Sequence, residues 1–129
     1  MNIHHIGYLV KKIDRAITCF QDLGYTLIQD IIIDDYRQAK ICFLEKDGYT
    51  VELVSPITKD SVVSGLLKKL GNTAYHICYE VGNLVDSIQE FQNKGFVICA
   101  EAHEAVAIQN RKVCFMIHPY SGMIELLER

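Results

Sequence analysis

The chain has 129 residues, of which half are hydrophobic and 22% are charged, and it contains only two prolines. Such a chain is long enough for one ordinary domain, and its composition excludes a disordered protein. The net charge of −3, with lysine and arginine scattered along the chain, argues against a nucleic-acid partner. No apolar run approaches the roughly 20 residues of a membrane span and no secretory signal opens the chain, so we expect a cytoplasmic protein without a membrane partner.

The first part of the chain predicts one supersecondary module. Residues 3–10 are rich in isoleucine, tyrosine and valine, as strands are. Apolar residues at helical spacing follow from Ile13 to Leu23, and Gly24 falls where a helix C-cap belongs. The segments YTLIQDIII, QAKICFLE and YTVELV then read as three further strands. Residues 1–56 therefore predict a βαβββ module.

A linker helix is predicted between the first module and the rest of the chain, over residues 57–72. Asp60 or Ser61 can cap its start, and Gly71 can end it. Because its apolar residues recur at helical spacing, we expect it to pack against the protein.

The remaining residues, 73–129, repeat the first module. A period near 72 residues is too long for a solenoid repeat, so it indicates two copies of one larger unit within a single domain. The aligned segments are HIGYLV at 5–10 with HICYEV at 76–81, KICFL at 40–44 with KVCFM at 112–116, and VELV at 51–54 with IELL at 124–127.

Two pairs of polar residues recur at matching places of the repeat: His5 with His76, and Glu52 with Glu125. All four lie in apolar strand patterns, where an unpaired imidazole or carboxylate costs several kcal/mol to bury. If the two modules pack about a pseudo-twofold axis, two imidazoles and two carboxylates meet at one point. Such a set suits a borderline divalent ion such as Ni, Co, Zn, Mn or Fe(II), and we expect Ni, Co or Zn.

The alignment selects His5 and not His4 as the ligand, because only His5 lies over His76. Neighbouring strand side chains point to opposite faces, so His4 is expected to point outward or to support the ligands. The same alternation places Gly7 and Cys78 on the site face.

The alternative interpretation is that the duplication preserves two buried ion pairs, since a single strand histidine or glutamate usually has an ordinary structural role. The weaker candidates have similar alternatives. His103 and His118 are expected in loops or turns. Three basic residues that flank the third strands are either solvated or available to an acidic cofactor tail: Arg37, Lys40 and Arg111. The five cysteines are interpreted as small buried residues in a reducing compartment: Cys19, Cys42, Cys78, Cys99 and Cys114.

The two βαβββ modules and the His, Glu, His, Glu order resemble the vicinal oxygen chelate superfamily over the whole chain. The segments that carry the resemblance are HHIGYLV, YTVELVSP, AYHICYEV and NRKVCFMIHPYSGMIELLE. The resemblance implies an α+β protein, residues 1–129, whose modules form a curved mixed sheet or open barrel of the glyoxalase/bleomycin-resistance kind. By the same resemblance, His5, Glu52, His76 and Glu125 take the places of the metal ligands.

Within the superfamily, the chain resembles compact glyoxalase I proteins and methylmalonyl-CoA epimerases. We expect glyoxalase I chemistry, in which the hemithioacetal of a 2-oxoaldehyde becomes a 2-hydroxyacyl thioester through an enediolate. Glu125 is the expected acid/base, with Glu52 as its symmetry-related partner. The segments SPITKDS and FMIHP favour the epimerase as the alternative, but HPYSGMIE is shorter than the usual epimerase turn and no second acid/base carboxylate can be placed. A third possibility is a binding protein without catalysis.

We expect no further cofactor, and a small thioester or hemithioacetal as the substrate. A homodimer is also expected, because open sheets leave edges that need covering. The sequence leaves open which metal and thiol are used, and whether the site lies within one chain or is shared between two.

Overall fold

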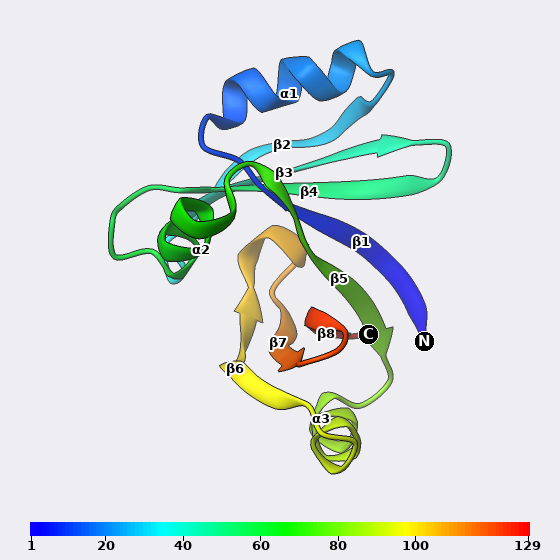
Figure 1. Cartoon of the computed structure of the whole chain (residues 1–129). Coiled ribbons are helices and arrows are strands. Elements are labelled where there is room, and N and C mark those ends of the chain that lie inside the picture. The colour runs from blue at the N-terminus through cyan, green and yellow to red at the C-terminus, as the bar shows by residue number, and fades with distance from the viewer. The chain divides into compact units, whose positions relative to one another are not determined.

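The computed structural model of the protein describes residues 1–129 (Figure 1). The predicted order of elements, βαβββ twice with a helix between, is confirmed, and so is the α+β class. The elements are β1 Asn2–Leu9, α1 Ile13–Asp22, β2 Thr26–Asp34, β3 Ala39–Lys46, β4 Tyr49–Pro56, α2 Val62–Leu70, β5 Thr73–Val81, α3 Leu84–Asn93, β6 Val97–Ala105, the short 3-10 helix Val106–Ile108, β7 Arg111–His118 and β8 Gly122–Glu128.

The chain divides into two compact units. One unit contains residues 1–5 together with 75–129, and the other contains residues 6–74. Strand β1 is therefore shared, because its first residues belong with the second copy of the repeat. This division assigns His5 to the same unit as His76 and Glu125.

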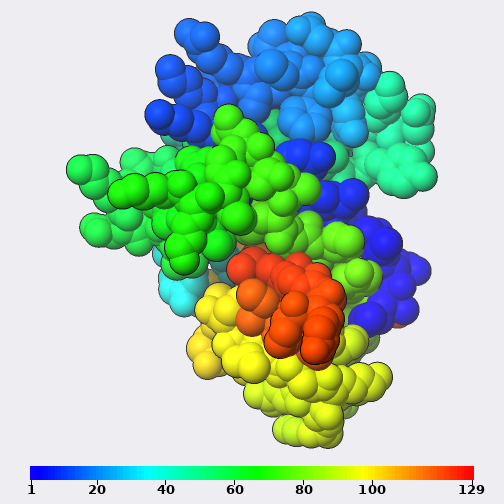
Figure 2. Space-filling view, viewed as in Figure 1, coloured from blue at the N-terminus to red at the C-terminus, as the bar shows by residue number.

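The unit of residues 6–74 contains β1 paired in parallel with β4, and β3 paired antiparallel with both β4 and β2. Helix α1 packs on this sheet, as Figure 1 shows, because its apolar stripe contains Ile13, Ile17 and Phe20. The side of α1 that faces away from the sheet is exposed (Figure 2). The buried core beneath the helix includes Cys42, Leu44, Val51 and Leu53, together with Val10 and Ile13.

The other unit repeats this arrangement. Strand β5 pairs in parallel with β8, and β7 pairs antiparallel with β8 and β6. Helix α3 supplies Leu84, Ile88 and Phe91 to the core. The buried residues of the strands correspond to those of the first copy: Val81, Cys114, Met116, Ile124 and Leu126. The duplication seen in the sequence is thus a duplication of structure.

The helix ends follow the predicted signals. Gly24 follows the C-cap residue of α1, and Gly95 follows the C-cap residue of α3. Their φ angles are 98° and 95°. Glycine adopts this left-handed region without the steric cost that a Cβ brings. Ser61 occupies the N-cap position of α2 but makes no side-chain capping hydrogen bond, and Gly71 is the C-cap residue.

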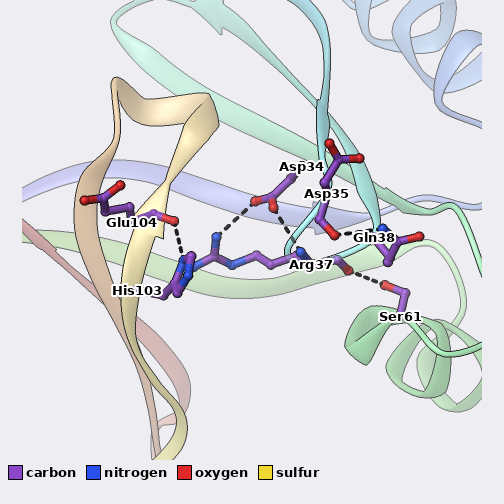
Figure 3. A network of polar contacts seen from close by, with 7 residues as sticks. All are labelled: Asp34, Asp35, Arg37, Gln38, Ser61, His103 and Glu104. Atoms are coloured by element: carbon purple, nitrogen blue, oxygen red, sulfur yellow. Dashed lines mark hydrogen bonds and ion pairs between the residues drawn. The ribbon is translucent and has the colours of Figure 1, made fainter.

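A polar network in the unit of residues 6–74 joins the β2–β3 turn to the start of α2 (Figure 3). The buried Asp34 carboxylate accepts hydrogen bonds from the backbone N–H and the guanidinium of Arg37, at 2.9 and 3.0 Å. Ser61 donates its hydroxyl to the carbonyl oxygen of Arg37 at 3.0 Å. These contacts give Arg37 a structural role.

Three details of the sequence prediction are corrected. Cys19 and Cys99 are exposed, whereas the other three cysteines are buried as predicted. His103 lies within β6, because the strand extends to Ala105, and His118 is the last residue of β7. Polar residues occur in β6 because alternate side chains of a strand point to opposite faces, and one face is solvated.

None of the helices is long and apolar enough to cross a lipid bilayer.

Candidate metal centre

Three of the predicted ligands come together from three strands of one unit. His5 lies in β1, His76 in β5 and Glu125 in β8. Their residues are buried, with exposed fractions of only 1%, 3% and 3%. His76 lies between Tyr75 and Ile77 and Glu125 between Ile124 and Leu126, whereas His5 lies between His4 and Ile6.

The three side chains meet through one atom each. Nε2 of His5 lies 3.1 Å from Nε2 of His76 and 3.1 Å from Oε1 of Glu125. Nε2 of His76 lies 3.2 Å from the same oxygen. Three donor atoms therefore form a nearly equilateral triangle in a water-excluded place.

This triangle has the dimensions of adjacent ligands on one metal ion. Donors held about 2.1 Å from an ion lie about 3.0 Å apart at a right angle and about 3.4 Å apart at a tetrahedral angle. The observed separations of 3.1 and 3.2 Å fall between these limits. Two imidazoles and a carboxylate are the ligand types of Zn, Ni and Co, so the residues fit a divalent metal ion.

Hydrogen bonding alone leaves this arrangement incomplete. The buried Oε1 of Glu125 has no hydrogen bond of ordinary geometry, although both imidazoles lie close to it. Burial raises the pKa of the Glu125 carboxyl, but the two imidazoles outweigh this and hold the pKa well below its usual range. The group is therefore an anion at neutral pH, as a metal ligand or a base must be.

The ring of His76 is held on two sides by aromatic rings. The centroid of Tyr75 lies 4.4 Å from that of His76, and the centroid of Phe115 lies 5.2 Å away, both nearly perpendicular. Edge-to-face packing of this kind restricts rotation of the imidazole. Phe115 also pairs with Glu125 across β7 and β8, so one aromatic residue lies beside two of the donors.

Glu52, the fourth predicted ligand, lies in β4 of the other unit and is 5% exposed. Its register repeats that of Glu125. Glu52 pairs with Gly7 in parallel and with Phe43 antiparallel, as Glu125 pairs with Cys78 and Phe115. All four predicted residues are thus buried, and their donor atoms suit a divalent metal ion.

Comparison with known proteins gives the family. Residues 4–115 match the family model of the glyoxalase/bleomycin resistance protein/dioxygenase superfamily. The chain belongs to this superfamily.

Proteins similar to the chain include methylmalonyl-CoA epimerases. The mitochondrial enzyme of Mus musculus is 21% identical over 91% of this chain, which spans 65% of that protein's length. The crystal structure of the Mycobacterium tuberculosis epimerase is 26% identical, with a TM-score of 0.82 over 98% of this chain and 86% of that one. A Streptomyces coelicolor epimerase in complex with 2-nitronate-propionyl-CoA shares the fold at 17% identity, with a TM-score of 0.83 over 99% of this chain and 94% of that one.

Two further residues lie close to His5: His4, for which the sequence predicted an outward or supporting position, and Cys78, which it placed on the site face. Nδ1 of His4 is 2.9 Å from Nδ1 of His5. The thiol of Cys78 is fully buried near both imidazoles, and burial raises its pKa to about 12. The Cys78 thiol therefore stays protonated, and it is not a reactive thiolate. The pKa of His4 is lowered, mainly by burial and secondly by the charge of the nearby His5, which keeps the His4 ring neutral.

The weaker candidates are placed elsewhere. Arg111 donates to the Glu80 carboxylate at 2.7 Å and to the carbonyl oxygen of Glu128 at 2.9 Å, which is a structural role. Lys40 is exposed on β3 and lines a cavity of about 380 Å³. Nδ1 of His103 lies 2.9 Å from the carbonyl oxygen of Glu104 (Figure 3).

Proposed function

We propose that the protein is a metal-dependent epimerase of a methylmalonyl thioester, with CoA as the thiol. The observation that carries the proposal is the buried triangle of His5, His76 and Glu125 in a chain whose similar proteins, in sequence and in structure, include methylmalonyl-CoA epimerases. The sequence patterns placed glyoxalase I first and this activity second. The comparisons favour the second.

We propose that Glu52 completes the ligand set, so that His5, Glu52, His76 and Glu125 together hold one divalent ion. The support is the repeat: Glu52 has the burial and the strand register that Glu125 has in the other copy. The bound ion would act as a Lewis acid that stabilises negative charge on the substrate's carbonyl oxygens.

In this proposal, Glu125 acts as the base, so its carboxylate must be released from the ion when the substrate binds. Its carboxylate is kept ionised by the two imidazoles, so it can take the proton from carbon 2 of the substrate. The C–H bond breaks, the electron pair moves to the thioester carbonyl, and the carboxyl becomes neutral. Inversion requires that carbon 2 then receive a proton on its opposite face, from a donor other than the carboxylates that hold the ion.

Metal-stripped protein reloaded separately with Co, Ni and Zn tests the proposal. We expect the reloaded protein to exchange the carbon-2 hydrogen of methylmalonyl-CoA for deuterium from heavy water and to interconvert the two epimers. The Glu125→Gln variant serves as the matched blank. Protein that binds metal but exchanges no hydrogen contradicts the proposal.

A second assay with methylglyoxal and a thiol separates the two related activities. Both reactions remove a proton next to a carbonyl, so the same donors serve either one. Formation of a 2-hydroxyacyl thioester without epimerisation would restore glyoxalase I as the activity. Tight binding of ligand with neither turnover would indicate a binding protein.

A further inference from the structure

The imidazole of His4 makes a contact that the proposed reaction does not use. Its Nδ1 lies 2.9 Å from Nδ1 of His5, while Nε2 of His5 faces His76 and Glu125. The two nitrogens of the His5 ring thus face different partners. Which of them carries the proton decides whether His5 can bind a metal ion.

A nitrogen–nitrogen separation of 2.9 Å is a hydrogen bond, in which one imidazole donates and the other accepts. If His5 donates through Nδ1–H, its Nε2 keeps a lone pair that faces His76 and Glu125. If His4 donates instead, the proton of neutral His5 lies on Nε2, and this nitrogen cannot coordinate a metal ion. The contact between two adjacent residues therefore selects between two tautomers.

We infer that His4 is a positioning residue: its Nδ1 accepts the Nδ1–H of His5 and holds His5 in the tautomer whose Nε2 binds the metal ion. This inference rests on the proposed metal site and deepens it. His4 is only partly buried, whereas His5 is 1% exposed.

Cys78 is the competing partner for His5. The Cys78 thiol lies within 4.8 Å of imidazole nitrogens of His4 and His5. In the sheet, Cys78 of β5 pairs with Glu125 of β8. Sulfur is a weak hydrogen-bond acceptor, whereas an imidazole nitrogen is a strong one. The orientation of His5 is therefore assigned to His4.

The test measures metal affinity, by competition with a chelator, and the visible spectrum of the cobalt-loaded protein. His4→Leu removes the acceptor, and His4→Asn returns an oxygen at a similar distance from the backbone. His118→Leu is the matched control, because His118 packs against Phe96 at the end of β7 and touches none of the donors. Cys78→Ala tests the competing partner.

We expect His4→Leu to weaken metal binding by about 10- to 100-fold, as loss of such a supporting hydrogen bond does. His4→Asn should recover most of the affinity and the wild-type cobalt spectrum, and the His118 control should match the wild type. Nitrogen NMR of zinc-loaded wild type should show the His5 proton on Nδ1. Undiminished metal binding by His4→Leu, or a larger loss in Cys78→Ala than in His4→Leu, would overturn the inference.

These outcomes are separate from those of the proposed activity. Protein that binds metal in a His4-dependent way but turns over no thioester would end the epimerase proposal and leave the inference standing. Epimerase activity with undiminished metal binding in His4→Leu would do the reverse.

Discussion

Nε2 of His5 and Nε2 of His76 lie 3.1 Å apart, although the residues are 71 positions apart in the chain. Two neutral imidazoles that face each other in this way share at most one hydrogen bond, and the Glu125 carboxylate lies beside both. Burying three such groups together is costly unless something else compensates them. A divalent ion bound at their common point would offset that cost.

Glu125→Gln should abolish turnover while the fold persists. The amide is nearly the same size as the carboxylate, but it cannot accept a proton from the substrate, and general-base catalysis contributes about 100- to 10,000-fold. Steady-state rates and circular dichroism of the metal-loaded variant measure the two effects. Glu101→Gln, the same change at an exposed position, is the control. A Glu125→Gln variant with wild-type rates would remove this residue from the mechanism.

Removing the metal should lower the stability of the protein. An ion that binds only the folded chain stabilises it by about 2.7 kcal/mol when its free concentration is 100 times the Kd. Thermal unfolding before and after chelation, followed by titration with zinc, measures this difference. His76→Ala should show no zinc-dependent shift, because a ligand is missing. Equal unfolding temperatures for stripped and reloaded wild type would argue against a metal centre.

The Glu80–Arg111 pair should make a pH-dependent contribution to stability. The hydrogen bond from the Arg111 guanidinium, opposed in part by burial, lowers the pKa of Glu80 from 4.5. A carboxyl whose pKa is lower in the folded state stabilises the protein above its unfolded pKa, and this contribution disappears as the pH falls through the folded pKa. Because the pair is partly exposed, with 24% and 22% of the two side chains accessible, we expect less than about 1 kcal/mol.

Comparison of Glu80→Gln with wild type in denaturant measures that contribution. The variant should be less stable at pH 7 and should approach the wild type as the pH falls from 4.5 through the lowered pKa of Glu80. Glu90→Gln is the control, because its pair with Lys94 is 60% exposed on both sides and should contribute little. A difference between Glu80→Gln and wild type that grows toward acid would contradict the assignment.

Leu53 and Leu126 occupy equivalent core positions of the two copies, and both are fully buried. Either one replaced by alanine should cost about 2–5 kcal/mol of unfolding free energy, because each truncation leaves a cavity. Urea unfolding of the two variants gives these values. Leu70→Ala, at a residue 54% exposed, should cost far less. Equal losses for Leu70→Ala and Leu126→Ala would show that the proposed core is not the stabilising one.

The sequence by itself determined the order of elements, the duplication and the candidate ligands. Strands and helices depend largely on local apolar spacing, which both copies show clearly, and Gly24 and Gly95 mark the same helix end twice. The candidate ligands could be picked out because a polar residue in an apolar strand is unusual, and its recurrence at the matching position of the second copy is informative. Dimerisation and a cytoplasmic location stay predictions.

Only the tertiary structure decided which of these residues meet and through which atoms. The first residues of β1 join the unit of the second copy, which no local pattern indicates, because strand pairing depends on contacts between distant segments. The structure also extends β6 through His103. It brings Nδ1 of His4 within hydrogen-bonding distance of Nδ1 of His5. Alternation along a strand gives the face on which a side chain lies, but the partner of each nitrogen depends on side-chain packing in three dimensions.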